Sequence, residues 1–438
     1  MNVPIAGLNP EKIILPGGLR VLFLPVADAR SATVGIWVAA GSRHESENER
    51  GVSHFIEHML FKGTARRSAR DISEEMDLLG GGLNAFTARE NTHYYAHTLA
   101  ENAEKAMDIL CDMLTAPRLD TGDIELERGV ILDEIAMYED CGDEVAADAM
   151  FAAVWPSSQM GSPICGTPET VSSLCREDMA DYMRRHYTPE RMVAVVAGGF
   201  DRDAMLELLR TTLDMIPRGG EMPDAGRPAA DVPEFVPAVA LTKKEFEQTS
   251  LIIAMPGFPR GDSRRYAVSV LNYITGGGAS SRLFQRLREE LGLAYSVYSS
   301  NYSAIEAGLF TISASFSADH QEQVLREIDA VLADIMRDIT SDEFERARAQ
   351  VKASLIMGME TVSSKAGHIG RMELFEQRQR EPSEILDALD ALTLSEVRAL
   401  ASELFSTPRA VSVAGDIKSQ EFYAPFCHMR RGFKQTLL

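Results

Sequence analysis

Two histidines and a glutamate near the start of the chain have the spacing of a metal site. His54, Glu57 and His58 form a His-x-x-Glu-His sequence inside a stretch whose apolar residues recur at helical spacing. On a helix, residues four apart lie on one face, so both imidazoles can reach one ion while Glu57 stands beside them. Histidine nitrogens and carboxylates at this spacing suit zinc, with bonds of roughly 2 Å. The segment therefore predicts a zinc-binding helix.

A catalytic zinc ion needs a third protein ligand from another element and keeps one open position. A second helical pattern, residues 120–138, carries Glu127 and Glu134 seven residues apart, which places them on nearly one stripe. One of the two could bind the metal while the other orients a histidine. The residues alone leave this choice open, and an acidic helix taken by itself is more often a solvated surface.

Three segments together resemble the pitrilysin-type metallopeptidases, and within them the β subunit of mitochondrial processing peptidase and its small bacterial relatives. These segments are residues 55–64, 83–95 and 127–134. The resemblance implies that His54, His58 and Glu134 bind one Zn²⁺ per chain. It also implies that Glu57 is the general base that activates water. Glu127 would contribute to catalysis by contacting a metal-binding side chain rather than the metal itself.

The polar stretch after the zinc helix predicts a hairpin. Residues 83–87 and 92–99 alternate like strands, with a turn between them. By resemblance, Asn84, Ala85 and Phe86 lie near the site and bind substrate, because an extended peptide can add to an exposed strand edge. Ordinary sheet packing is the alternative reading of the same residues.

The second half of the chain contains another candidate pair. By resemblance, Arg288 and Tyr295 bind substrate and face the zinc across a closed chamber, where a cation and a phenol could hold a developing oxyanion. From the residues alone, they would be a surface helix position and half-buried strand packing. Their segment, 276–298, is expected to be the counterpart of the zinc helix. The glycine run that begins it lacks the residues of a phosphate-binding loop.

The chain is internally duplicated. Residues 181–199 are echoed by 400–416, and Pro189 and Pro408 stand half a chain length apart. Strand-like runs and long helices mix without strict alternation, which predicts an α+β fold. The resemblance implies two homologous domains, each a largely antiparallel sheet with helices packed on it.

The duplication and a stretch rich in glycine and proline predict the domain boundaries. We expect a zinc-binding catalytic domain over residues 1–217, a linker over 218–236, and a second domain over 237–438 that contributes substrate binding.

Composition narrows the classes of function. The 44 basic and 65 acidic side chains give a net charge of −21, which argues against nucleic acid binding. Such acidity permits a preference for basic peptides, and equally serves solubility alone. The five cysteines are odd in number and lack a Cys-x-x-Cys pair, so free thiols are expected. No apolar run has membrane-spanning length and no signal peptide is evident, so we expect a cytoplasmic protein without membrane contact.

These observations favour a zinc-dependent endopeptidase that cleaves extended peptides or unfolded polypeptide segments inside a closed chamber. Two alternatives keep the fold without the reaction: a core or assembly subunit of a larger complex, and a module that only binds peptides. By resemblance, a chain with two such domains needs another chain to close the chamber. A homodimer is expected, with a heterodimer as the alternative.

Overall fold

The computed structural model describes residues 8–219 and 232–427, and these form two compact units. Unit 1 comprises residues 8–135, 163–219 and 356–383, and unit 2 comprises residues 136–162, 232–355 and 384–427. Each unit is thus assembled from separate stretches of the chain. The contiguous division predicted from the sequence stays a prediction, and most of its linker, residues 220–231, lies outside the described residues.

Unit 1 is built on one sheet with the strand order β1-β2-β6-β3-β5-β4. Its strands are β1 (Glu11–Ile14), β2 (Arg20–Pro25), β3 (Ser31–Val38), β4 (Gly82–Thr87), β5 (Thr92–Leu99) and β6 (Met192–Gly198). Neighbouring strands pair antiparallel except β2 and β6, which are parallel. Strand β4 lies at an edge, so one side of its backbone is open to a further strand.

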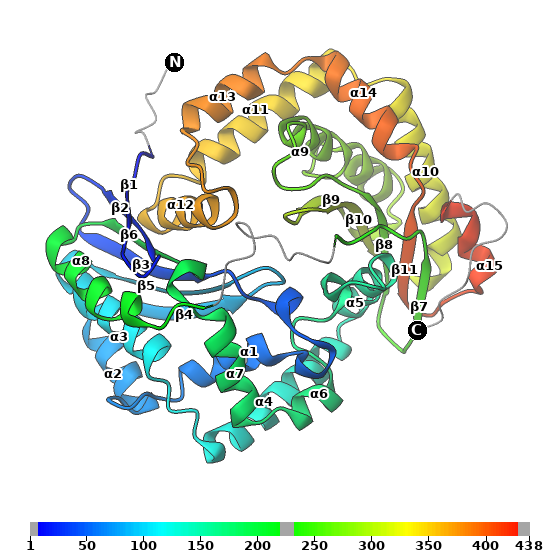
Figure 1. The fold of residues 1–438 in the computed structure, drawn as a ribbon. Coiled ribbons are helices and arrows are strands. Elements are labelled where there is room, and N and C mark those ends of the chain that lie inside the picture. Colours follow the sequence, from blue (N-terminus) through cyan, green and yellow to red (C-terminus); the bar gives the residue numbers. More distant parts are fainter. Residues whose placement is uncertain (1–7, 220–231, 428–438) are drawn as a thin grey trace. The chain divides into compact units, whose positions relative to one another are not determined.

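Helices cover both faces of this sheet (Figure 1). They are α1 (Val52–Leu60), α2 (Ala69–Leu78), α3 (Ala103–Thr115), α4 (Thr121–Glu139), α6 (Pro168–Ser173), α7 (Arg176–His186), α8 (Arg202–Thr211) and α12 (Val362–Glu376). The main core lies where α1 and α3 pack on the sheet, and it buries alternate residues such as Ile36, Tyr94 and Val196. This core fixes the position of the histidine-bearing helix α1.

Unit 2 repeats the plan with the strand order β7-β11-β8-β10-β9. Its strands are β7 (Val239–Lys243), β8 (Thr249–Pro256), β9 (Ala294–Ser303), β10 (Gly308–Phe316) and β11 (Ala410–Gly415). The pair β7 and β11 is parallel and the other pairs are antiparallel. Its helices are α5 (Gly142–Val154), α9 (Arg265–Thr275), a π-helix (Phe284–Glu290), α10 (Gln321–Arg337), α11 (Ser341–Met357), α13 (Pro382–Ala391), α14 (Leu394–Phe405) and α15 (Gln420–Tyr423).

The two halves of the sequence each give one helix to the other half's sheet. Helix α5 packs on β11, β8 and β7 of unit 2, and α12 packs on β6, β3 and β2 of unit 1. Because strand side chains alternate, the buried Val193 and Val195 under α12 lie on the face opposite the main core. Each sheet is therefore completed by a segment that is distant in sequence.

The duplication predicted from the sequence is confirmed by the order of elements. The succession β4, β5, α3 in unit 1 matches β9, β10, α10 in unit 2, and α7–β6 matches α14–β11. The predicted α+β fold with two largely antiparallel sheets is confirmed as well. One expectation is wrong: by position between β8 and β9, α9 rather than the segment 276–298 is the counterpart of α1. The π-helix takes the place of α2.

The predicted free thiols are confirmed: all five cysteines lie in the described residues, and none is in a disulfide. In the described part of the chain, no helix is both long and apolar enough to cross a membrane.

Candidate metal centre

Helix α1 presents His54 and His58 from a rigidly held backbone. Its N-cap, Gly51, has φ 90°, and a Cβ added there would lie 2.6 Å from the carbonyl oxygen of Cys165, so glycine is required. The buried carboxylate of Glu45 accepts hydrogen bonds from the backbone N–H of Gly51 and of Ser53, at 2.8 and 2.9 Å. These bonds satisfy donors at the start of α1 that the helix itself leaves free.

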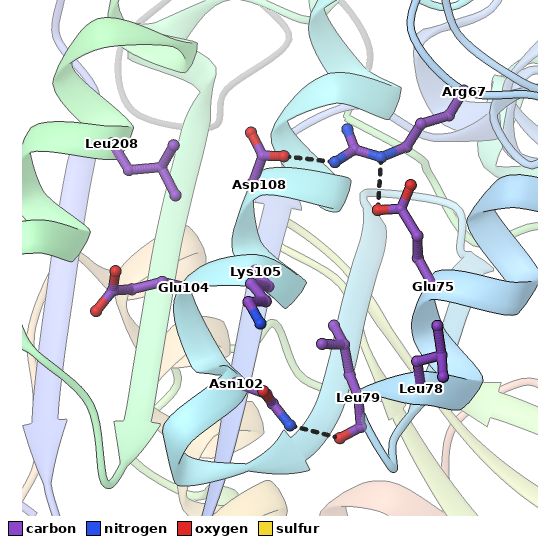
Figure 2. Close-up of a pocket in the computed structure, with 9 residues that line it drawn as sticks. All are labelled: Arg67, Glu75, Leu78, Leu79, Asn102, Glu104, Lys105, Asp108 and Leu208. Carbon is purple, nitrogen blue, oxygen red and sulfur yellow. Dashed lines mark hydrogen bonds and ion pairs between the residues drawn. The ribbon is translucent and has the colours of Figure 1, made fainter.

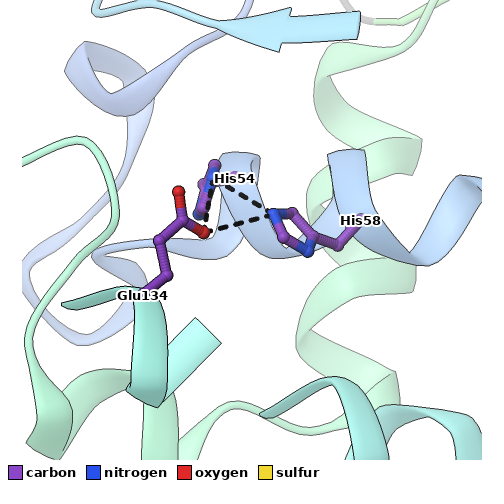
Figure 3. Close-up of side chains that lie close together, drawn as sticks. All are labelled: His54, His58 and Glu134. Carbon is purple, nitrogen blue, oxygen red and sulfur yellow. Dashed lines mark hydrogen bonds and ion pairs between the residues drawn. The ribbon is translucent and has the colours of Figure 1, made fainter. Parts of the chain in front are cut away.

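The structure brings His54, His58 and Glu134 together (Figure 3). The two Nε2 atoms are 3.3 Å apart, and Glu134 Oε2 lies 3.7 Å from that of His54 and 3.6 Å from that of His58. Ligands bound at about 2 Å with tetrahedral angles stand roughly 3.3 Å from one another. The three atoms therefore have the type and separation that a tetrahedral ion requires.

The electrostatics of His54 suit a ligand role. Burial, followed by the neighbouring His58, lowers the pKa of His54 to about 4. Its imidazole is therefore neutral at pH 7 and has a lone pair to offer.

Glu127 contacts the far side of His58. Its Oε1 lies 2.9 Å from His58 Nδ1, and its other oxygen pairs with Lys62. A carboxylate that accepts a hydrogen bond from Nδ1–H leaves Nε2 unprotonated and directed toward Glu134. The two glutamates of α4 thus have different surroundings, with Glu134 beside both Nε2 atoms and Glu127 behind one ring.

The side chain of Glu57 extends from α1 toward the edge strand β4. Its Oε2 accepts a hydrogen bond of 2.5 Å from the Thr87 hydroxyl at the end of β4. Burial raises the pKa of Glu57 above its ordinary value, and the Thr87 hydrogen bond opposes this shift. The charges of His58 and Glu134 also act on the pKa of Glu57, which directly precedes His58 on α1.

The predicted substrate-binding residues of the first half lie on β4, next to Glu57. Asn84 and Phe86 are exposed on one face, and Ala85 turns to the face that packs toward α1. The expected open edge near the site is therefore present.

Arg288 and Tyr295 also lie together, within unit 2. The guanidinium carbon of Arg288 is 5.9 Å from the centroid of the Tyr295 ring, which is 72% exposed on the edge strand β9. Their placement across a chamber from the histidines stays a prediction.

Sequence reasoning missed several residues that hold the site. Lys62 follows His58 by one helical turn, a spacing that could have pointed to it. Glu45 and Thr87 carry no such signal, because Glu45 reaches the start of α1 from an irregular loop six to eight residues earlier and Thr87 reaches Glu57 from a strand 30 residues later. The same holds for the buried pair Arg43 and Glu90, whose 2.7 Å contact ties the tip of the β4–β5 hairpin to the loop before α1.

Another hollow of unit 1, of about 540 Å³, includes none of the predicted site residues. It is lined by Arg67, Glu75, Leu78, Leu79, Asn102, Glu104, Lys105, Asp108 and Leu208. Figure 2 shows that Arg67 is already paired with Glu75 and Asp108, and that Asn102 donates to the carbonyl of Leu79. We place no reaction there.

Comparison with known proteins assigns the chain to a family. The profile described as "Insulinase (Peptidase family M16)" matches residues 20–168, and the profile described as "Peptidase M16 inactive domain" matches residues 173–351. A protein of Mycobacterium tuberculosis (strain ATCC 25618 / H37Rv), named "Uncharacterized zinc protease Rv2782c", is 40% identical over 94% of both chains. The chain belongs to peptidase family M16. Another M16 relative, "Uncharacterized zinc protease YmxG" of Bacillus subtilis, is 38% identical over 90% of this chain and 96% of its own.

Solved structures carry the same fold as this M16 chain. A protease from Helicobacter pylori superimposes with a TM-score of 0.84 at 19% identity, covering 93% of this chain and 99% of that one. A protein from Pseudomonas fluorescens, described as a peptidase M16 inactive domain, gives 0.84 at 20% identity over 94% and 99%. The resemblance to pitrilysin-type metallopeptidases is therefore confirmed at the level of family and fold.

Proposed function

We propose that this M16 chain is a zinc-dependent endopeptidase that hydrolyses extended peptides or unfolded segments. The observation that carries the proposal is the cluster of two histidine nitrogens and one carboxylate oxygen at 3.3–3.7 Å, with Glu57 beside it. The names of its M16 relatives, which call them zinc proteases, support the same reaction class.

His54, His58 and Glu134 would hold the zinc ion. When bound, zinc supplies Lewis acidity, which polarises a carbonyl and lowers the pKa of water. Glu57 takes the proton from the attacking water and delivers it to the departing amine. Its raised pKa makes Glu57 a stronger base than an ordinary glutamate, which favours the removal of the proton from water.

Other residues of the chain position these groups. Thr87 holds the Glu57 carboxylate by its hydrogen bond, and Glu127 fixes the ring of His58. The open edge of β4 takes the peptide as an added strand, which brings a scissile bond next to Glu57. We further propose that Arg288 and Tyr295 bind the substrate.

The assembly we propose is a homodimer in which the zinc-binding half of one subunit and the second half of its partner enclose the substrate. Such an enclosure admits extended segments and excludes folded proteins. The two alternatives, an assembly subunit and a peptide-binding module, do not require Glu57 beside an intact set of ligands.

The test combines metal analysis with digestion of a mixed peptide library, read by mass spectrometry. We expect about one zinc per chain, cleavage that a chelator abolishes, and a Glu57→Gln variant that keeps zinc and loses turnover. Asp133→Asn, an exposed neighbour of Glu134, is the matched control and should leave both unchanged. Parental turnover in Glu57→Gln would refute the assignment of the base.

A further inference from the structure

Glu127 lies between a cation and a histidine ring of the candidate metal centre. Its Oε1 is 2.9 Å from His58 Nδ1, and its Oε2 pairs with the ammonium group of Lys62. The Glu127 side chain is only 7% exposed, so these two partners, rather than solvent, satisfy its oxygens. The row of contacts runs from Lys62 through Glu127 to His58, whose Nε2 faces Glu134.

Lys62 is held just beyond the C-terminal end of α1. It follows His58 by four residues, a spacing that places both on one side of the helical turn. Its backbone N–H donates to the Met59 carbonyl at 3.0 Å, which continues the helical path past Phe61. The lysine side chain is 36% exposed and is not part of the core. Its charge can therefore be removed without opening a cavity in unit 1.

The charge of Lys62 opposes the effect of Glu127 on His58. A carboxylate that accepts the Nδ1–H of an imidazole makes the other ring nitrogen a stronger ligand. A cation on the second oxygen stabilises the negative charge of Glu127 and so weakens that oxygen pair as an acceptor. The sign of the effect on the ring is therefore set by Lys62 as well as by Glu127.

The same cation also compensates Glu127 when no metal is bound. A buried carboxylate is costly unless a positive charge lies beside it, and Lys62 supplies that charge. Without Lys62, the positive charge that best compensates Glu127 is a dication held by His54, His58 and Glu134. Both arguments predict that removing the lysine charge strengthens metal binding.

The arrangement occurs behind one of the two histidines. His54 Nδ1 is buried and has no hydrogen-bond partner among the described residues. In that part of the chain, a charged pair behind an imidazole therefore occurs at His58 and not at His54.

We propose that Lys62 is a positioning residue that acts on His58 through Glu127, and that its charge lowers the affinity of the site for zinc. A ligand that donates less charge leaves the metal the stronger Lewis acid, which serves the polarisation of a carbonyl. The inference rests on the proposed function, because it assumes that His54, His58 and Glu134 hold zinc. It deepens that function by naming a residue that limits how tightly the metal is held.

The experiment measures zinc affinity of the full-length chain by competition with a chromogenic chelator, without substrate. Lys62→Gln keeps a hydrogen-bond donor but removes the charge, and we expect it to bind zinc about tenfold tighter, the lower end of the effects of groups behind a ligand. Lys62→Arg keeps the charge and should match the parent. Arg118→Gln removes a nearby cation that pairs with Asp123 instead of Glu127, and this matched control should also match the parent.

A second pair of variants tests the route through Glu127. In a Glu127→Gln background the carboxylate charge is gone, so adding Lys62→Gln should produce no gain in zinc affinity. The sign of the main effect also separates the proposal from a structural role. Damage to the fold would weaken zinc binding, whereas the loss of an opposing charge strengthens it.

Equal or weaker zinc binding by Lys62→Gln would overturn the proposal, and so would an equal gain in the Glu127→Gln background. Either result, obtained with a parent chain that binds zinc, leaves the proposed function standing. A parent chain that binds no zinc would defeat the proposed function and this inference together.

Discussion

Two glycines on α12 should respond in opposite ways to the same substitution. At Gly370, an added Cβ would lie 2.2 Å from Trp37 Nε1 and within 3 Å of two further atoms of that ring. At Gly367, one turn earlier, no atom lies within 4 Å of the added carbon. Both glycines lie inside the helix, so alanine gains the same helix-forming free energy at either position, about 0.5–1 kcal/mol.

The expected magnitudes follow from these distances. Gly367→Ala should raise the free energy of unfolding of unit 1 by about 0.5–1 kcal/mol. Gly370→Ala must displace the Trp37 ring, which is 2% exposed and stacked on His93. Overpacking of this kind costs roughly 1–3 kcal/mol, so this variant should be destabilised by up to about 2 kcal/mol after the helix gain.

Urea unfolding followed by tryptophan fluorescence measures the difference. A Trp155→Phe background leaves Trp37 as the emitting residue of the described chain, since the sequence holds two tryptophans. Hydrogen exchange of β3 and β6 amides should show faster opening in Gly370→Ala and no loss of protection in Gly367→Ala. Equal stabilisation of both variants would refute the packing of Trp37 against α12.

Three further outcomes are expected. Glu134→Gln should weaken zinc binding far more than Glu127→Gln, whose loss should be on the order of 10–100-fold, and isothermal titration would measure both. Burial raises the pKa of Glu45 to about 7 from an ordinary 4.5, so the folded chain holds that proton more tightly. The resulting stability is complete below about pH 4.5 and is lost as pH rises through 7, and Glu45→Gln should flatten this slope in urea unfolding. If sites are shared between subunits, a mixed dimer of Glu57→Gln and Tyr295→Phe chains should recover up to about half of parental activity.

Each of these has a contradicting result. Zinc affinities in the reverse order would exchange the roles of Glu134 and Glu127. An unchanged pH slope in Glu45→Gln would show that another group causes it. A tag-purified mixed dimer no more active than its parents would reject a site shared between subunits.

Local features of the molecule were predictable from the sequence. The histidine-bearing face of α1 and the two strands of the β4–β5 hairpin followed from helical and alternating periodicity, since each pattern needs only neighbours in sequence. The histidine pair followed from spacing on one helix. Choosing Glu134 over Glu127 needed the family resemblance, because both lie on nearly one stripe of α4 and only their distances to the histidines distinguish them.

Contacts between distant segments were not predictable. Thr87 reaches Glu57 across 30 positions with no periodic pattern to reveal the contact. Glu45 is near α1 in sequence, but it reaches the helix from an irregular loop whose path the sequence does not predict. The counterpart of α1 was predicted wrongly because the glycine run at 276–278 resembles the start of a helix, whereas the true counterpart, α9, ends just before that run. The same absence of a pattern hid α12, whose sequence gives no indication that it packs on the sheet of the other half.

The exchange of α5 and α12 affects how the protein is made on the ribosome. When the first half has emerged, Val193 and Val195 of β6 still lack the helix that buries them, because α12 begins 164 residues after the end of β6. At 5–20 residues per second, that interval is on the order of 10–30 seconds. During it the nascent chain presents an apolar strand face to solvent or to a chaperone. The first unit can complete its packing only after α12 has been translated, by which time most of unit 2 has also been made, so the two units are expected to mature together rather than one after the other.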